Sequence, residues 1–373
     1  MKIAVNTRLL LPNKLEGIGW FTYESFQRIC TQHPEHEFLF IFDRTFDKQF
    51  IFSENITPVV APPPTRHPYL WFTWFEFVVP YILKKHKANC FVSPDGFLSL
   101  RTKVPSIAVI HDINFVHRPQ DLPKTVRNFY NHYFPLYAAK AERIATVSEF
   151  SKNDIATSYH IDKNKIDVVY NGVNEKYRPL NESEKQQVRH RFSKGEPYFV
   201  FVGALHPRKN VARLLAAFNI FKKRWNAPFK LLIVGAEMFQ TGEISEVYKK
   251  MEFSEDVIFT GRLSHNDLSF VVGAAFALTF VPYFEGFGIP IVEAMACNTP
   301  VITSNVTSMP EVAGEAALFV DPFDIEDIAE KMFRIVQDET LRNQLIEKAK
   351  LQVKKFSWNN TANNLWNSIM KAF

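Results

Sequence analysis

Short apolar runs, rich in β-branched and aromatic residues, alternate along the chain with longer segments in which apolar residues recur at helical spacing. This alternation is typical of βαβ units, in which helices connect parallel strands. Two series of such units are expected. The first has predicted strands at Lys2–Asn6, Glu37–Phe42, Asn89–Ser93, Ser106–Ile110, Arg143–Val147 and Lys165–Val169. The second has them at Tyr198–Val202, Phe229–Val234, Asp256–Phe259, Phe276–Phe280, Pro300–Thr303 and Ala317–Phe319.

A polar segment separates the two series. Residues 174–198 are rich in charge, and Pro179, Gly195 and Pro197 interrupt them. A chain of 373 residues is long enough for two hydrophobic cores. We therefore predict a first Rossmann-like domain over residues 1–194 and a second over residues 195–355. Residues 356–373 have the spacing of an amphipathic helix, which needs an apolar surface to pack on.

Composition excludes several classes of protein. Apolar residues make up 46% and charged residues 22%, as in ordinary globular chains. Three widely spaced cysteines support neither a disulfide framework nor a metal cluster, and no apolar run has the length of a membrane span or the form of a secretory signal. We expect a cytoplasmic protein. The net charge of +5 is scattered, which argues against nucleic acid and leaves an anionic small molecule, an anionic lipid surface or a solvated positive face.

The segment from His67 to Ala88 is unusually aromatic and ends in Lys84, Lys85 and Lys87. One interpretation is a buried or half-buried helix that leads into the strand at Asn89–Ser93. The other is a helix at a membrane interface, which the mixture of aromatic and basic residues favours.

The segment FVPYFEGFGIPIVEAMACNTP, residues 280–300, combines a strand, a glycine-rich turn and a helix. Glycines let the backbone approach a ligand closely, and free amides at a helix start favour a phosphate. Glu285 and Glu293 flank this turn and are expected to accept hydrogen bonds from sugar and ribose hydroxyls. The alternatives are a solvated loop carboxylate for Glu285 and a favourable acid in the first helical turn for Glu293.

A second strand-to-helix junction lies in YFVFVGALHPRKNVARLLAAF, residues 198–218. Its strand runs into Gly203, and Arg208 and Lys209 follow where a helix is expected. An arginine fork and a lysine point charge at a strand's carboxyl end can hold a diphosphate. The alternative is a solvated pair of surface cations.

The first domain contributes two candidates. Gly17 and Gly19 form a Gly-x-Gly turn after the first strand, but Thr22 occupies the place of the third glycine of a dinucleotide fingerprint. A helix N-terminus that faces phosphate, or a plain turn, fits better. His111 follows the strand at Ser106–Ile110, where its imidazole either reaches substrate hydroxyls or serves in packing. The sequence lacks a HExxH motif, a cysteine cluster or an Asp-x-Asp, so we assign no metal and no cofactor.

Taken together, these segments resemble the retaining GT-B glycosyltransferases of family four. The matching stretches are GIGWFTYE, HDINFVHRP, ATVSEFSKNDI, VVYNGVNEKYRP, VGALHPRKN, EGFGIPIVEAMACNTPVITSNVTSMPEVAGEAALFVDP and FSWNNTA. Glu285 and Glu293, with seven residues between them, correspond to the paired glutamates of that family. FVSPDGFLSL and VRNFYNHYFPLYAAKAERIATVSEFS most resemble bacterial mannosyltransferases of surface polysaccharide assembly.

The resemblance implies two facing Rossmann-like domains, with the acceptor on the first, the donor on the second, and a last helix that crosses back to the first. Ala204 departs from the pattern, since some members have arginine there, so Arg208 must supply more of the charge. The resemblance implies that Glu285 contacts hydroxyls of the donor sugar, that Glu293 contacts the ribose, and that Arg208 and Lys209 contact the diphosphate. It implies that His111 contacts the donor sugar and that Gly17 and Gly19 contact the distal phosphate. The backbone contacts to sugar and phosphate would come from Gly203, Gly286, Phe287, Gly288 and Ile289.

The expected reaction is metal-independent transfer of a hexose from a nucleotide diphosphate, with retention of anomeric configuration. No acceptor-side carboxylate stands out as a nucleophile, which favours a front-face reaction in which the departing phosphate accepts the acceptor proton. GDP-mannose is the first expectation for the donor and a UDP-sugar the second. The acceptor is expected to be a saccharide, free or lipid-linked, and the enzyme either cytoplasmic or peripheral on the inner face of the membrane. A nucleotide-sugar epimerase, a phosphorylase and an inactive carbohydrate-binding subunit remain alternatives.

Overall fold

A computed structural model of the chain describes residues 1–12, 14–225, 227–235 and 242–373. The chain divides into two compact units, the first comprising Met1–Gly172 and Trp358–Phe373 and the second Val173–Ser357. Among the described residues, no helix is both long and apolar enough to cross a membrane.

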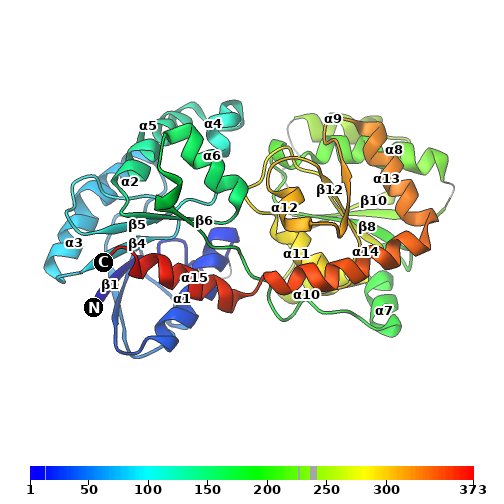
Figure 1. The fold of residues 1–373 in the computed structure, drawn as a ribbon. Coiled ribbons are helices and arrows are strands. Elements are labelled where there is room, and N and C mark those ends of the chain that lie inside the picture. Colours follow the sequence, from blue (N-terminus) through cyan, green and yellow to red (C-terminus); the bar gives the residue numbers. More distant parts are fainter. Residues whose placement is uncertain (13, 226, 236–241) are drawn as a thin grey trace. The chain divides into compact units, whose positions relative to one another are not determined.

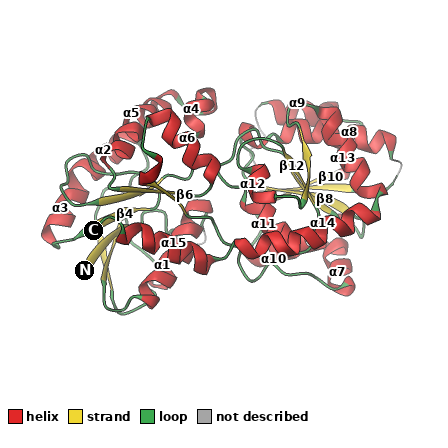
Figure 2. Ribbon diagram, viewed as in Figure 1, coloured by secondary structure: helices red, strands yellow, loops and turns green. Residues whose placement is uncertain are grey.

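The first unit is a parallel sheet covered by helices on both faces (Figures 1 and 2). Its strand order is β3-β2-β1-β4-β5-β6-β7, and every pair is parallel. The strands are β1 Lys2–Asn6, β2 Glu37–Phe42, β3 Ile56–Val60, β4 Cys90–Ser93, β5 Ser106–Val109, β6 Arg143–Thr146 and β7 Ile166–Val168. The helices are α1 Gly17–Gln32, α2 Pro68–Thr73, α3 Val79–Lys85, α4 Asn114–His117, α5 Lys124–Lys140, α6 Glu149–Tyr159 and α15 Trp358–Met370.

Strand β3 was not expected from the sequence. It contains Pro58, which cannot donate a hydrogen bond to a neighbouring strand and therefore argues against a central strand. The structure places β3 at the edge of the sheet, where it pairs only with β2 and the missing donor costs little.

The second unit repeats the plan, with strand order β10-β9-β8-β11-β12-β13. All its strand pairs are parallel, so the α/β class and the doubly wound architecture are confirmed for both units. The strands are β8 Tyr198–Val202, β9 Lys230–Val234, β10 Val257–Gly261, β11 Ala277–Phe280, β12 Val301–Ser304 and β13 Ala317–Val320. The helices are α7 Glu182–Ser193, α8 Val211–Arg224, α9 Glu243–Lys250, α10 His265–Ala274, α11 Ile289–Ala296, α12 Met309–Ala313, α13 Ile325–Gln337 and α14 Glu339–Gln352.

The division between the units falls after Gly172, earlier than the boundary expected near residue 194. The polar segment folds as α7, whose start is fixed by a reciprocal capping box between Asn181 and Glu184. Helix α7 packs on α10, and the side chain of Leu180 lies against Gly273, where an added Cβ would come within 2.9 Å of Leu180 Cγ. These contacts join the segment to the second unit, because a charged surface helix still needs one face to pack.

Each sheet reverses its winding at one place. In the first unit β1 lies between β2 and β4, and in the second β8 lies between β9 and β11. Open α/β sheets bind ligands at the carboxyl ends of strands at such a switch point. The loops after β1 and β4, and after β8 and β11, are therefore where a site is expected.

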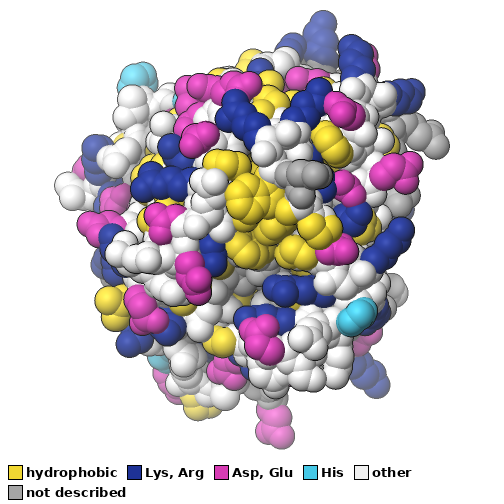
Figure 3. Space-filling model, turned by 90° about the vertical axis from the view of Figure 1, so that its right-hand side faces the viewer, with side chains coloured by type: hydrophobic (Ala, Val, Ile, Leu, Met, Phe, Trp, Pro, Cys, Tyr) yellow, Lys and Arg dark blue, Asp and Glu magenta, His cyan; other side chains and the backbone are white. Residues whose placement is uncertain are grey.

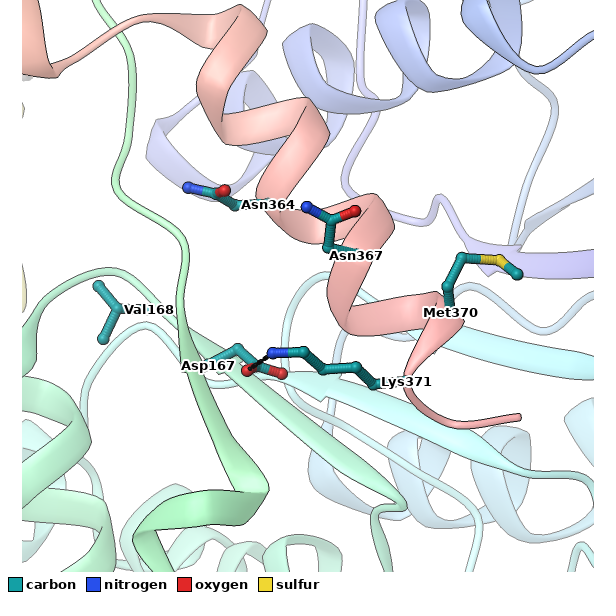
Figure 4. A pocket seen from close by; sticks show the side chains of 6 residues that line it. All are labelled: Asp167, Val168, Asn364, Asn367, Met370 and Lys371. Atoms are coloured by element: carbon teal, nitrogen blue, oxygen red, sulfur yellow. Dashed lines mark hydrogen bonds and ion pairs between the residues drawn. The ribbon is translucent and has the colours of Figure 1, made fainter.

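Helix α15 belongs to the first unit and packs on α1. Ala362, Leu365 and Ile369 are fully buried in that contact. At its end Asp167 of β7 accepts hydrogen bonds from Ser368 Oγ at 2.8 Å and Lys371 Nζ at 2.7 Å. A shallow pocket lies beside this junction (Figure 4), but Asp167 and Lys371 in its lining bind each other, and β7 is the edge strand of its sheet, far from the switch point at β1 in the strand order.

The face of the molecule shown in Figure 3 carries a patch of hydrophobic side chains bordered by charged ones. Lys and Arg side chains alternate there with Asp and Glu, and no large area of one sign is seen on that face. The positive net charge is therefore not concentrated on that face.

Candidate active site

Two cations and one carboxylate meet at the switch point of the second unit. Arg208 Nη1 and Lys209 Nζ both form ion pairs with Oε1 of Glu285, the lysine at 2.5 Å. Arg208 Nη1 also donates to the Phe284 carbonyl at 3.2 Å, and the lysine Nζ lies 4.9 Å from the centre of the Phe280 ring. The three side chains are 11% to 21% exposed, so this cluster is largely enclosed and yet reachable. The structure thus brings together three residues that the sequence assigned to one site.

The backbone conformation of the loop after β8 positions Arg208 and Lys209 beside Glu285. After β8 the chain turns at Gly203, whose φ of +152° suits glycine, and Pro207–Lys209 form a single 3-10 turn. Asn210 then adopts a left-handed conformation, and its side-chain amide donates to the carbonyls of Val281 at 2.9 Å and Pro322 at 2.7 Å. The loop after β8 is thereby fixed to the loops after β11 and β13.

Residues at the start of α12 contact the Glu-Gly-Phe-Gly turn after β11. Ser308 Oγ contacts the carbonyl oxygens of Glu285 at 2.8 Å and Phe287 at 3.2 Å. Gly288 has φ +97°, and an added Cβ would lie 2.8 Å from Cε of Met309. Among the described residues, no acceptor contacts the amides of Gly288 and Ile289 at the start of α11. These two amides are therefore available to a phosphate or a sugar oxygen.

The sequence placed Glu293 in the first turn of the helix after the glycine-rich turn. The structure places it one turn later. Because the left-handed Gly288 caps α11, the helix begins at Ile289 and Glu293 falls in the second turn. Burial raises the pKa of Glu293 to about 8, and the neighbouring Tyr177 hydroxyl opposes that shift. Tyr177 comes from the polar segment before α7, so this segment contributes to the surroundings of Glu293.

His111 follows β5 in the first unit and is held on two sides. Its Nε2 lies 2.9 Å from the carbonyl oxygen of Pro94, and its ring meets Phe21 of α1 edge-on at 5.0 Å. A carbonyl can only accept, so Nε2 carries the hydrogen in this contact. Burial lowers the pKa of His111, which keeps the ring neutral near pH 7 and leaves Nδ1 as an acceptor.

The Gly-x-Gly turn is part of helix α1 and not a loop before it. Helix α1 begins at Gly17, which is exposed, whereas Gly19 is buried. A Cβ at Gly19 would lie 3.0 Å from the carbonyl oxygen of Leu9 and 3.1 Å from Cδ2 of Leu15. Gly19 therefore permits close packing of the helix against the loop after β1, and Gly17 stands at the exposed helix start.

The structure adds a buried polar network at the switch point of the first unit. Arg8 Nε lies 2.5 Å from Asp95 Oδ2, and Arg8 Nη1 donates to Thr65 Oγ1 at 3.1 Å. Asp95 Oδ1 accepts from Asn6 Nδ2 at 2.8 Å and from Ser93 Oγ at 3.0 Å. Arg8 and Asp95 were not among the residues predicted from the sequence. The rule that selected His111, a polar residue just after a strand, would have found both, because they follow β1 and β4.

Among the residues that the structure describes, no three His, Cys, Asp or Glu side chains gather in a way that could hold a metal ion. The positive charge at the second switch point is supplied by Arg208 and Lys209.

Comparison with known proteins places each unit in a family of sugar-transferring enzymes. The model of the glycosyl transferases group 1 matches residues 182–352, and the model of glycosyltransferase family 4 matches residues 30–177. The first match covers Arg208, Lys209, Glu285 and Glu293, and the second covers His111.

Curated relatives and solved structures agree with this. The chain is 33% identical to the O-antigen chain mannosyltransferase RfbU of Salmonella typhimurium over 72% of this chain and 71% of that one. It is 26% identical to O-antigen chain mannosyltransferase B of Escherichia coli over 93% of each. WaaG, a glycosyltransferase of lipopolysaccharide biosynthesis, has the same fold, with a TM-score of 0.76 at 16% identity over 98% of this chain and 99% of that one. HepE of Anabaena, solved with UDP-glucose, has a TM-score of 0.77 at 15% identity over the full length of both chains.

Proposed function

The chain belongs to the group 1 glycosyltransferases, which have the GT-B fold, and on that premise we propose that it transfers mannose from GDP-mannose to a saccharide with retention of configuration and without a metal ion. Transfer of a sugar from a nucleotide donor is the activity of its family. The observation that carries the finer proposal is the cluster of Arg208 and Lys209 on Glu285 at the second switch point.

This cluster is suited to an exchange of partners. Both cations contact Oε1 of Glu285. A bound diphosphate attracts Arg208 and Lys209 more strongly than a single carboxylate does, because it carries more charge and more acceptor oxygens. Glu285 is then released to accept hydrogen bonds from hydroxyls of the transferred sugar.

The same cations serve the chemical step. When the bond between the sugar and the diphosphate breaks, negative charge develops on the departing oxygen, and Arg208, Lys209 and the amides of Gly288 and Ile289 stabilise it. That oxygen accepts the proton of the attacking hydroxyl on the same face of the sugar, which retains the configuration. His111 contributes Nδ1 as an acceptor for a hydroxyl of the donor sugar, since Nε2 is engaged with Pro94.

The identity of the donor is supported by the relatives. Two of them, at 33% and 26% identity, are O-antigen mannosyltransferases. Mannose is therefore the proposed sugar, GDP the proposed nucleotide, and a saccharide of a surface polysaccharide, free or lipid-linked, the proposed acceptor. A UDP-sugar is the second donor to be tested.

A thermal-shift panel tests the donor. The purified chain is heated with GDP-mannose, GDP, UDP-glucose, UDP-N-acetylglucosamine or UDP, each with and without Mg²⁺. A ligand at about 100 times its Kd adds roughly 2.7 kcal/mol of stability, so GDP compounds are expected to raise the Tm and Mg²⁺ to leave the rise unchanged. A rise with UDP compounds alone would replace the proposed nucleotide, and a rise that needs Mg²⁺ would contradict metal independence.

A further inference from the structure

The helical segment after β3 has one buried face and one exposed aromatic face. It comprises α2, a π turn over Trp74–Val78, and α3 (Figure 1, cyan). Trp74, Phe75 and Val79 are fully buried in the core of the first unit. This confirms a half-buried helix, as one interpretation of the sequence expected, and leaves the opposite face to be explained.

Three aromatic side chains form a stripe along that opposite face. Tyr69 is 78% exposed, Phe77 48% and Tyr81 63%. Residues four apart lie close to one line on a helix, and the wider π turn keeps Phe77 in line with Tyr69, eight residues earlier. We call these three residues the aromatic stripe. Exposed rings in such number are unusual for one short segment of a protein surface and indicate contact with something outside the chain.

Cations accompany the aromatic stripe. Lys84 and Lys85 are exposed in the last turn of α3, and the ammonium of Lys85 lies 6.0 Å from the centre of the Tyr81 ring. The Arg101 guanidinium lies 4.3 Å from the centre of the Phe77 ring. Arg101 is also ion-paired with Glu76 at 3.9 Å, so the positive charge of this face comes chiefly from Lys84 and Lys85.

Acidic residues are absent from the exposed side of this segment. Between Asn55 and Pro94 the sequence contains one acidic residue, Glu76. Glu76 is 3% exposed, and its Oε1 accepts a hydrogen bond from the amide of Leu100 at 3.0 Å. The exposed charges of this segment are therefore positive.

We propose that the aromatic stripe and its cations dock the first unit on an anionic lipid bilayer. Tyrosine rings favour the boundary between acyl chains and headgroups, and lysines extend their ammonium groups from that depth to the phosphates. Each basic residue near an anionic surface adds attraction that salt weakens. The segment lies in the interface plane and does not span the membrane, because its opposite face remains in the protein core.

The composition of the face favours lipid over a protein partner. Protein–protein interfaces are depleted of lysine, whereas this face carries Lys84, Lys85 and the exposed Lys87. If the acceptor of the proposed function is lipid-linked, docking also brings the enzyme to the surface that holds it. The docking itself does not depend on which sugar is transferred.

Vesicle flotation of the full chain tests the proposal. We expect the protein to float with vesicles that contain about one third phosphatidylglycerol, and to remain behind with pure phosphatidylcholine vesicles at the same moderate ionic strength. The double variant Lys84→Glu/Lys85→Glu should lower the fraction bound by at least roughly 10-fold. Its matched control is Lys249→Glu/Lys250→Glu, which reverses an equivalent exposed pair in the last turn of α9 and should bind as the parent does.

The aromatic stripe is tested separately. Tyr69→Ser/Tyr81→Ser should lose flotation, whereas Leu351→Ser, at a site that is 68% exposed in α14, should retain it. All four variants should keep the parent Tm and the parent shift with nucleotide, which separates this proposal from the proposed function. The proposal is overturned if the protein does not float at all, whatever the phosphatidylglycerol content of the vesicles. It is also overturned if Lys249→Glu/Lys250→Glu lowers the bound fraction as much as Lys84→Glu/Lys85→Glu does, or if the protein self-associates through Tyr69 and Tyr81 and does not bind vesicles.

Discussion

Lys209 and Glu285 form an ion pair in which the ammonium lies 2.5 Å from Oε1, while Arg208 contacts the same oxygen. One carboxylate oxygen therefore contacts both cations. Arg208 and Lys209 follow β8 and Glu285 follows β11, and the two strands are neighbours at the switch point of their sheet. Replacing Lys209 should therefore affect chiefly the contact with the diphosphate, and replacing Glu285 chiefly the contact with the sugar.

Replacing Lys209 by alanine should lower kcat/KM by about 10- to 100-fold, because a charged hydrogen bond to the leaving group is lost. Steady-state kinetics with saturating acceptor measure the effect. Lys223→Ala, which removes an exposed lysine from the far end of α8, is the matched control. Parent-like kinetics in the Lys209 variant would remove this residue from the site.

Replacing Glu285 by glutamine should affect two ligands in opposite directions. The affinity for the nucleotide diphosphate alone should stay equal or rise, because Arg208 and Lys209 lose a competing anion. Transfer should fall by about 100-fold or more, since the sugar loses a charged acceptor. Calorimetry with the diphosphate and kinetics with the sugar donor provide the two readings. Equal weakening of both would show that Glu285 only positions the cations.

Glu293 should make stability depend on pH in the absence of nucleotide. Burial raises its pKa from an ordinary 4.5 to about 8, so the folded chain binds this proton more tightly than the unfolded chain does. The stability that it contributes is complete below about pH 4.5 and is lost as the pH rises towards 8. Glu293→Gln cannot titrate. As the pH rises from about 5 to 8, the free energy of unfolding of the variant should therefore increase relative to that of the parent by at least about 1 kcal/mol, or a few degrees of Tm. A constant difference in Tm across that range would contradict the assignment.

Gly288 should tolerate a side chain poorly for two reasons. Its backbone angle is left-handed, and Met309 lies where the added Cβ would be. Gly288→Ala places a Cβ 2.8 Å from Met309 at φ +97°, whereas Gly242→Ala places one in open space at φ +107°. The first variant should lower the free energy of unfolding by about 2 kcal/mol or more and weaken donor binding, and the second by about 1 kcal/mol with donor binding intact. Urea titration and thermal shift with nucleotide compare the two. Similar behaviour of both variants would mean that the fit against Met309 does not matter.

The Arg8–Asp95 pair should be costly to break from one side. Both side chains are almost fully buried, at 7% and 4% exposed, so Asp95→Asn leaves a guanidinium without its counter-charge and should cost about 3 kcal/mol. Adding Arg8→Met to that variant should recover part of the loss, because the unpaired charge is removed. Urea unfolding of the single and double variants measures the coupling. Additive losses would show that the two residues do not act as a pair.

Much of the fold was predictable because buried parallel strands and amphipathic helices leave a clear pattern. The strand at Tyr198–Val202 is reproduced to the residue, since each of its side chains is buried and it is bounded by Pro197 and Gly203. Edge strand β3 was missed, because Pro58 is tolerated only where no neighbour needs its donor. The domain boundary was missed because charge marks a surface segment but does not say which unit the segment lies on.

The structure brings Arg208, Lys209 and Glu285 into contact, and the sequence indicated these residues but not the contacts between them. Arg208, Lys209 and Glu285 were selected because they follow strands of the same predicted sheet, yet their mutual pairing could not be read from spacing. The surroundings of Glu293 include Tyr177, which is distant in sequence and on a segment that had been assigned to the other domain. The network of Arg8 and Asp95 depends on the strand order β1-β4, which the pattern of one chain does not reveal.

The stereochemistry of donor hydrolysis tests the central proposal most directly. With water as the acceptor, GDP-mannose is incubated with the enzyme in the presence of EDTA, and the first mannose released is followed by proton NMR before its anomers equilibrate. Retention at a metal-independent site predicts that the α anomer appears first, together with GDP, and that Lys209→Ala slows its release by about 10- to 100-fold. Release of the β anomer first, or turnover only after a divalent metal is restored, would contradict the account.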